Sequence, residues 1–204
     1  NLCHPPTVDL AAIMLADSAH IYEEDAAFLN KKKRKHGEAM VEPLYTRYDA
    51  EKVESLFEPI NYDQPFQPVE GVTARFVEAG HILGSSAIVL EVEESEERKR
   101  LWFSGDIGRY KLPLLRDPVL PQDANILLME CTYGNRQHDD PEQAYRKFRD
   151  IVKRTIHRGG NVVVPAFAVG RTQEIVYSLN RMISEGELPP MPVYVDSPLA
   201  INAT

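Results

Sequence analysis

Three predicted strands are each followed by a side chain that can bind a metal ion or move a proton. The side chains are His81, Asp106 and Glu130, after strands predicted over residues 72–79, 101–104 and 126–129. If these strands are neighbours that end at one sheet edge, an imidazole and two carboxylates meet in one crevice, where open α/β sheets bind their ligands. Imidazole and carboxylate are typical ligands of Zn²⁺, which lowers the pKa of bound water to about 7. The residue types therefore predict part of a polar, metal-binding site.

A purely structural interpretation of these residues stays open. In it His81 is a loop histidine, Asp106 caps a turn or helix, and Glu130 is a buried acid paired with arginine. A zinc site needs at least three protein donors, and these spacings supply too few. The other histidines have no ligand-like neighbour at short spacing, and we expect surface roles for all of them: His4, His20, His36, His138 and His157.

A second candidate feature is the passage from strand to helix over residues 164–174. Exposed backbone N–H groups there, with Arg171 nearby, could bind an anion such as a substrate phosphate. The alternative is that Arg171 pairs with Glu174 while Thr172 caps the helix. The chain contains no GxxxxGK loop, no dinucleotide fingerprint and no GxSxG elbow, which argues against a serine hydrolase.

The amino-terminal part of the chain reads as helix followed by a strand-rich meander. Helical periodicity runs from Thr7 to about residue 26, and the KKKRK sequence at 31–35 is interpreted as a solvated connector in preference to a nucleic-acid patch. A short helix over 48–56 and a turn-like stretch over 57–68 follow. Strands are predicted over 72–79, 86–92, 101–104 and 126–129, the last covered on both faces because its run is continuously apolar.

After residue 140 strands and helices alternate, which is typical of a parallel α/β unit. Helices are predicted from Pro141 to a Gly159-Gly160 stop, over about 170–184 and from Pro198, and strands over 161–165 and 193–195. The change of pattern near residues 134–141 is the candidate domain boundary. The chain begins at Asn1 without a lead-in and stops soon after its last helix begins, so we expect it to be the middle of a longer polypeptide.

Composition sets the broad class. The 204 residues carry 23 Lys and Arg against 31 Asp and Glu, a net charge of −8 that decides nothing about substrate, and their ordinary composition excludes collagen, coiled coil and wholesale disorder. No apolar run reaches the roughly 20 residues of a membrane span, and there is no export signal, so we expect a soluble, cytoplasmic protein. Cys3 and Cys131 lie far apart, and we expect free thiols.

Five motifs occur together and in order. They are AGHILGS at 79–85, SGDIG at 104–108, ECTYG at 130–134, PAFAVGR at 165–171 and DSPLA at 196–200. In this order the chain resembles metallo-β-lactamase-fold RNA-processing nucleases of the β-CASP group. The resemblance implies an α/β fold, with part of a metallo-β-lactamase-type αββα sandwich over residues 1–135 and the start of an inserted β-CASP α/β domain over 136–204.

The resemblance also implies site residues. His81 matches a histidine that binds one of two zinc ions, Asp106 matches the carboxylate that bridges both, and Glu130 matches the acid that supports a later catalytic histidine. The implied activity is zinc-dependent hydrolysis of RNA. Single-stranded RNA would lie between the two domains near Arg171, Tyr133 and Ser197, with no membrane partner and with a homodimer left open.

The departures from the family pattern matter as much. The HxHxDH motif that supplies most zinc ligands, and the histidines expected after DSPLA, are absent from the chain. We therefore expect this segment alone to bind zinc weakly and to cut no RNA, while the intact parent protein is the ribonuclease. The alternatives are a DNA-processing nuclease of the same group, which generally has Asp where this chain has Glu130, a non-catalytic scaffold subunit, and a small-molecule hydrolase.

Overall fold

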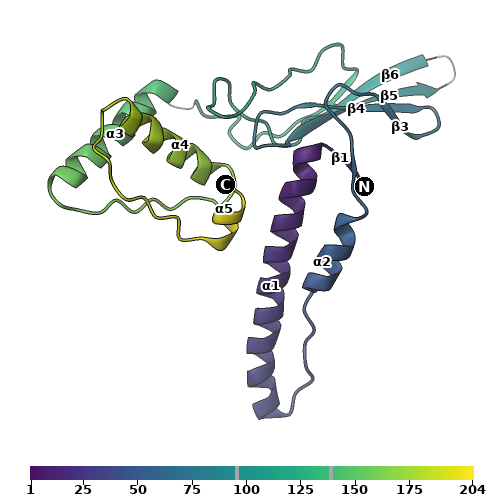
Figure 1. Ribbon diagram of the computed structural model, residues 1–204. Coiled ribbons are helices and arrows are strands. Elements are labelled where there is room, and N and C mark those ends of the chain that lie inside the picture. Colours follow the sequence, from purple (N-terminus) through teal and green to yellow (C-terminus); the bar gives the residue numbers. More distant parts are fainter. Residues whose placement is uncertain (95–96, 138–139) are drawn as a thin grey trace.

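The computed structural model describes residues 1–94, 97–137 and 140–204, and its centre is a five-stranded mixed sheet (Figure 1). The strands lie in the order β3 (Phe66–Val69), β4 (Val72–Glu78), β5 (Ser86–Glu94), β6 (Glu97–Phe103) and β7 (Ile126–Leu128). Pairing is antiparallel from β3 to β6 and parallel between β6 and β7. A short parallel pair joins β1 (Leu2–Cys3) to β2 (Glu58–Pro59). The predicted α/β class is confirmed.

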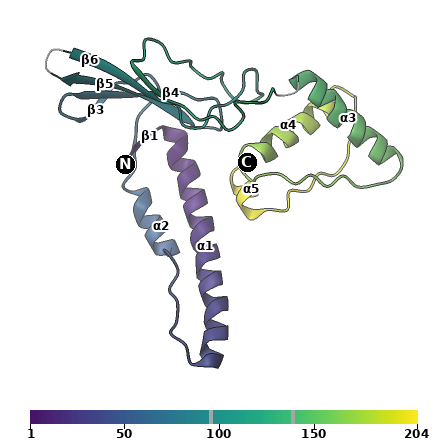
Figure 2. The same ribbon diagram turned by 180° about the vertical axis from the view of Figure 1, so that it is seen from behind.

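The described residues also form five helices, which lie in two groups (Figure 1). They are α1 (Pro5–His36), α2 (Arg47–Glu54), α3 (Pro141–His157), α4 (Arg171–Ser184) and α5 (Pro198–Asn202). The helix α1 extends away from the sheet with α2 beside it, and α3 to α5 gather at one side, as the view from behind also shows (Figure 2). In the described part of the chain no helix combines the length and the apolar character needed to span a bilayer.

The helix α1 includes the basic sequence 31–35, so this sequence is helical and is not the expected connector, although four of its five residues are exposed as expected of a solvated run. Lys and Arg are good helix formers, and cations near a helix carboxyl end interact favourably with its dipole. The helix ends only at Gly37, whose φ of 68° is left-handed. The run nevertheless lowers the stability of the helix, because like charges four residues apart destabilise a helix by roughly 0.2–0.5 kcal/mol per pair.

Three predicted strands differ in the structure. The residues of β7 are 47–48 % exposed, so the strand is not covered on both faces. It lies at the sheet edge, and among the described strands it pairs with β6 alone. The segments 161–165 and 193–195 pair with no strand in the described part of the chain, and Val163 and Tyr194 are 89 % and 86 % exposed. A strand needs a partner supplied from elsewhere in the fold, which local pattern cannot provide.

Two separate groups of buried side chains stabilise the fold. Val77, Ala87, Val89 and Trp102 pack within the sheet region, and Val152, Leu179, Met182 and Leu188 pack between and beside α3 and α4. The two groups fall on opposite sides of the sequence boundary at residues 135 and 136. The division into two domains itself stays a prediction.

We expect Val89→Ala to lower the free energy of unfolding by about 2 kcal/mol, because it removes two methyl groups from a side chain with no exposed surface. Val163→Ala is the matched control, since its side chain is 89 % exposed and the change should stay within about 0.5 kcal/mol. Urea denaturation of both variants measures the difference. Equal losses would contradict the assignment of Val89 to the core.

Candidate functional site

Sheet topology brings the ends of β4, β6 and β7 to one edge. Two successive antiparallel pairings make β4 and β6 run in the same direction, and β7 is parallel to β6. The segments after the three strands carry His81, Asp106 and Glu130. His81 Nε2 lies 3.9 Å from Asp106 Oδ2, and both side chains are well exposed, by 45 % and 77 %. The structure therefore brings together the groups predicted to form the site, while their roles in metal binding and catalysis stay predictions.

Glu130 ties the end of β7 to the loop that carries Asp106. Its Oε1 accepts a 2.7 Å hydrogen bond from the backbone N–H of Ile107, the residue after Asp106. Its own N–H donates to Oγ of the buried Ser104 at 3.0 Å. The Ile107 N–H lowers the pKa of Glu130, and hydrogen bonds from Thr132 and the charge of His81 lower it further. Glu130 therefore stays ionised at neutral pH and holds the Asp106 loop in place.

The loop that carries His81 is fixed mainly by polar groups of other residues. Ser85 Oγ accepts hydrogen bonds from the N–H groups of His81 and Ile82, at 3.0 and 3.2 Å. The Tyr62 hydroxyl donates to the Ser85 carbonyl at 2.8 Å. Glu78 Oε1 accepts from the N–H of Gly80 at 2.8 Å. These bonds fix the backbone from which the imidazole of His81 projects.

The His81 and Asp106 loops pack backbone against backbone. The N–H of Gly108 donates to the Ala79 carbonyl at 2.8 Å. A Cβ at Gly108 would overlap the Gly80 carbonyl group and come within 2.7 Å of the His81 nitrogen. Gly80 itself has a left-handed φ of 65°. This contact needs glycine at position 108, and it sets the separation of His81 and Asp106.

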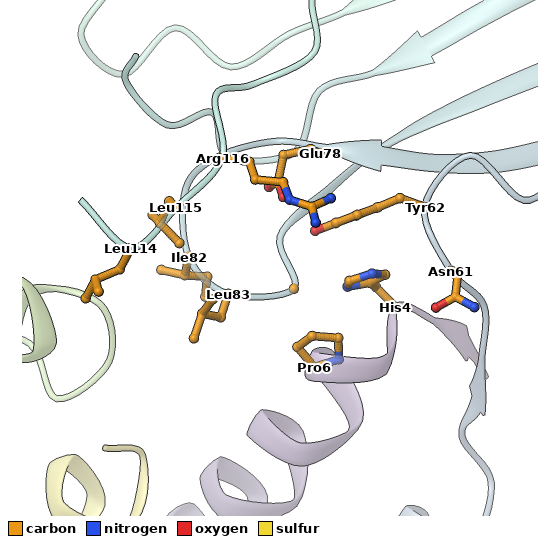
Figure 3. Close-up of a pocket in the computed structure, with 11 residues that line it drawn as sticks. His4, Pro6, Asn61, Tyr62, Glu78, Ile82, Leu83, Leu114, Leu115 and Arg116 are labelled. Atoms are coloured by element: carbon orange, nitrogen blue, oxygen red, sulfur yellow. The ribbon is translucent and has the colours of Figure 1, made fainter. Parts of the chain in front are cut away.

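Behind the His81 loop lies a pocket of about 390 Å³ (Figure 3). His4, Tyr62, Glu78 and Arg116 form its polar side, and its apolar side includes Ile82, Leu83, Leu114 and Leu115. His4 stacks on Tyr62 with ring centroids 3.6 Å apart. Its Nδ1 is buried and has no hydrogen-bond partner among the described residues.

The surface role expected for His4 is therefore wrong. Burial lowers the pKa of its imidazole. The expectation failed because the Tyr62 ring that covers His4 lies 58 residues along the chain. Of the other histidines, His20 lies near Glu24 on α1 at 3.5 Å, and His138 lies outside the described residues.

The predicted substrate contacts differ in position. Arg171 donates a 2.7 Å hydrogen bond to Glu174 on α4, which is the pairing of the alternative interpretation. The helix cap of that interpretation is wrong, because Thr172 donates its hydroxyl to the Phe167 carbonyl and does not cap that helix. A Cβ at Gly170 would lie 3.1 Å from Ile82 Cγ2, so the start of α4 adjoins the His81 loop.

Ser197 and Tyr133 are the other two predicted contacts. Ser197 caps α5 by accepting from the Ala200 N–H at 3.2 Å. Tyr133 is 56 % exposed and follows the site residue Glu130 by three positions. The substrate roles of Arg171, Tyr133 and Ser197 stay predictions.

Several residues that build the site were given no role from sequence: Tyr62 and Glu78, and, within the first two motifs, Ser85, Ser104 and Gly108. Ser85 had a detectable signal, because serine side chains commonly accept hydrogen bonds from nearby loop N–H groups. Tyr62 had none, since its bond to Ser85 spans 23 residues.

The residues present fit part of a zinc site. An imidazole nitrogen and a carboxylate oxygen face each other at 3.9 Å, and both are donors that zinc prefers. Within residues 1–94, 97–137 and 140–204 no group of three or more His, Cys, Asp or Glu is placed to hold a metal ion. His81 and Asp106 therefore need further donors to complete a site.

We expect Tyr62→Phe to remove part of the loss of stability at alkaline pH. Burial, and next the charge of Glu78, raise the pKa of Tyr62 from 10.0 to about 12. Because the folded state keeps this proton between those values, the wild-type free energy of unfolding falls as pH rises through that window. Urea denaturation across that window measures the slope. Tyr48→Phe, at a site 63 % exposed, is the control, and an unchanged slope in Tyr62→Phe would contradict the prediction.

Glu130→Gln should flatten the acid limb of the stability profile. The folded-state pKa of Glu130 is lowered, so its contribution is fully present above the ordinary glutamate pKa and is lost as pH falls through the lowered value. Glutamine can still accept from the Ile107 N–H, and we expect a loss of about 1 kcal/mol at pH 7 because a charged acceptor is replaced by a neutral one. Denaturation from acid to neutral pH tests this, with the exposed Glu70→Gln as control. Parallel wild-type and Glu130→Gln curves would refute it.

Comparison with known proteins adds evidence of relationship. The chain is 36 % identical over 162 residues to Ribonuclease TTHA0252 of Thermus thermophilus, covering 79 % of this chain and 36 % of that protein. It is 35 % identical over 209 residues to an RNase J-like protein of Methanocaldococcus jannaschii, covering 99 % and 43 %. It is 31 % identical over 159 residues to Cleavage and polyadenylation specificity factor 73 of Drosophila melanogaster, covering 77 % and 22 %.

The chain spans less than half the length of each of these three relatives. No protein-family model matches it. The names of these relatives are nevertheless consistent with the family that the five ordered motifs indicate. The chain belongs to the β-CASP group of metallo-β-lactamase-fold proteins.

Proposed function

We propose that this chain forms part of the active site of a zinc-dependent ribonuclease. The observation that carries the proposal is the convergence of His81, Asp106 and Glu130 at one sheet edge, with His81 and Asp106 3.9 Å apart. Support comes from relatives named as a ribonuclease and an RNase J-like protein. The proposal concerns the full-length protein, by which we mean a polypeptide that carries these 204 residues together with an HxHxDH segment.

The finer architecture is part of the proposal. Residues 1–135 would belong to an αββα sandwich of the metallo-β-lactamase type, and residues 136–204 to an inserted β-CASP domain. The mixed sheet of the first region and the separate apolar group of the second support this division. Single-stranded RNA would pass between them, near the start of α4.

Each residue has a chemical task in this scheme. His81 and Asp106 would hold zinc, with the remaining donors supplied by the HxHxDH segment and later histidines. A zinc ion held there would supply Lewis-acid chemistry, namely activation of water at neutral pH and stabilisation of negative charge on a phosphodiester. Ser85 and Tyr62 hold the backbone of the His81 loop. Glu130 positions the Asp106 loop through the Ile107 N–H and, being ionised, can orient the imidazole that protonates the leaving oxygen.

The alternatives have less support. A DNA-processing nuclease of the same group would use the same metal donors. However, two of the relatives are named as a ribonuclease and an RNase J-like protein, and residue 130 is Glu where the DNA-processing branch generally has Asp. A scaffold subunit would not need His81 and Asp106 kept together and exposed, or Glu130 held beside them. A small-molecule hydrolase has no need of the region after residue 136.

We also propose a cytoplasmic location, supported by the free thiols of Cys3 and Cys131.

Replacing the metal donors tests the proposal directly. We expect His81→Ala and Asp106→Ala to reduce RNA cleavage by the full-length protein to background, because each removes a zinc donor. Glu130→Gln should reduce cleavage by about 10–100-fold, since it acts by positioning. Cleavage of a single-stranded RNA at saturating zinc is the measurement, with the exposed Glu70→Gln as control. Undiminished cleavage in the His81 or Asp106 variant would refute the assignment.

The isolated 204-residue chain provides the complementary measurement. We expect less than one zinc ion per chain by elemental analysis after a chelator wash, and no cleavage. Stoichiometric zinc in the washed chain would show that these residues alone complete a site.

A further inference from the structure

The far end of α1 carries a concentrated positive charge that the proposed active site does not use. We call it the basic run, and it consists of Lys31, Lys32, Lys33, Arg34 and Lys35. Successive residues of an α-helix are rotated by about 100°, so five in a row surround the whole circumference. All five are exposed except the partly buried Lys33.

Two of these cations have a partner within the part of the chain that the structure describes. Lys33 Nζ lies 3.4 Å from a Glu38 carboxylate oxygen, and Lys32 Nζ lies 4.6 Å from the centre of the Phe28 ring. Lys31, Arg34 and Lys35 form no ion pair with any residue that the structure describes. Three positive charges therefore project into solvent from one helix end.

The basic run contains more cations than the stability of the helix requires. One or two cations in the last turn are enough to complement the dipole, whereas Lys31 and Lys35 are four residues apart and repel each other. The chain as a whole has a net charge of −8, so this end is a local reversal of sign. A positive patch on a negatively charged protein attracts a polyanion locally without causing non-specific binding over the rest of the surface.

We propose that the basic run binds the phosphate backbone of single-stranded RNA, away from the site of cleavage. The inference rests on the proposed function for the identity of the strand. Lys31, Arg34 and Lys35 lie within a sector of about 100° around the helix axis and within four residues along it, so the three unpaired cations form one compact patch. A flexible strand with regularly spaced phosphates can place a phosphate against each cation of this patch, and the proposed function supplies such a strand.

The distance from the active site follows from the helix. At its start α1 contacts the His81 loop, where the Thr7 hydroxyl donates to the Gly84 carbonyl at 3.0 Å. Lys31 lies 24 positions further along, which at 1.5 Å per residue is about 36 Å. Both views show this end of α1 remote from the sheet (Figures 1 and 2). At about 3.4 Å per phosphate in a stacked strand, roughly 11 nucleotides cover that distance.

The test is the triple variant Lys31→Gln, Arg34→Gln, Lys35→Gln, because glutamine has nearly the helix propensity of lysine. Binding of a poly(U) strand of about 30 nucleotides to the 204-residue chain is measured in EDTA across a salt series. We expect weaker binding and a plot of log affinity against log salt that is less steep by about 2, since three phosphate contacts are lost. The ratio of wild-type affinity to variant affinity should therefore fall roughly 16-fold between about 50 and 200 mM salt.

The control variant Lys52→Gln, Lys99→Gln, Lys153→Gln removes three exposed, dispersed cations and gives the same net charge. It should bind poly(U) almost as wild type does, and both variants should keep the wild-type helical signal on circular dichroism. Equal affinity and slope in the basic-run variant, or an equal loss in the control, would overturn the proposal. So would competition by poly-glutamate that matches poly(U) at equal charge, because the site would then not be selective for phosphates.

Cleavage by the full-length protein separates this proposal from the proposed function. The basic-run variant should lose rate on RNA longer than about 11 nucleotides and keep it on a strand of about 5 nucleotides. An equal loss on both lengths would contradict a remote contact. Absence of any metal-dependent RNA cleavage in wild type would refute the proposed function, while the binding measurement in EDTA would still decide whether the basic run holds a phosphate backbone.

Discussion

The close approach of two loop backbones, at Gly80 and Gly108, determines the geometry of the candidate site. A hydrogen bond from Gly108 to Ala79 fixes the approach, and no side chain can be accommodated at position 108. Because the imidazole of His81 and the carboxylate of Asp106 project from these loops, their 3.9 Å separation depends on a contact that neither side chain makes. Polar bonds from Ser85, Tyr62 and Glu130 then hold each loop from its outer side.

Strand direction is the second constraint. The chain reverses twice between β4 and β6, and the pairing of β7 is parallel, so the three strands end at one edge. A single change of direction among them would place one of the three groups at the opposite end of the sheet. The exposed position of the donors is consistent with a site that closes only when other protein segments contribute ligands.

Local signals in the sequence were sufficient for most helices and for the order of the site residues. The helices α3 and α4 match the predicted ranges because Pro141, the Gly159-Gly160 stop and Gly170 mark their ends. The segments 161–165 and 193–195 were predicted as strands from composition, yet strand formation depends on a neighbour that lies elsewhere in the fold. The supports of the site were hidden for the same reason, since Tyr62 and Ser85 meet only after folding.

The uncovered edge of the sheet has a consequence for the behaviour of the chain in solution. β7 offers a row of backbone donors and acceptors on its outer side, together with apolar side chains that are nearly half exposed. Such an edge is a template for pairing with a strand of another molecule. Concentrated samples of this 204-residue chain will therefore tend to self-associate through β7, and a lysine introduced at Leu127 would protect the monomer by making that pairing electrostatically unfavourable.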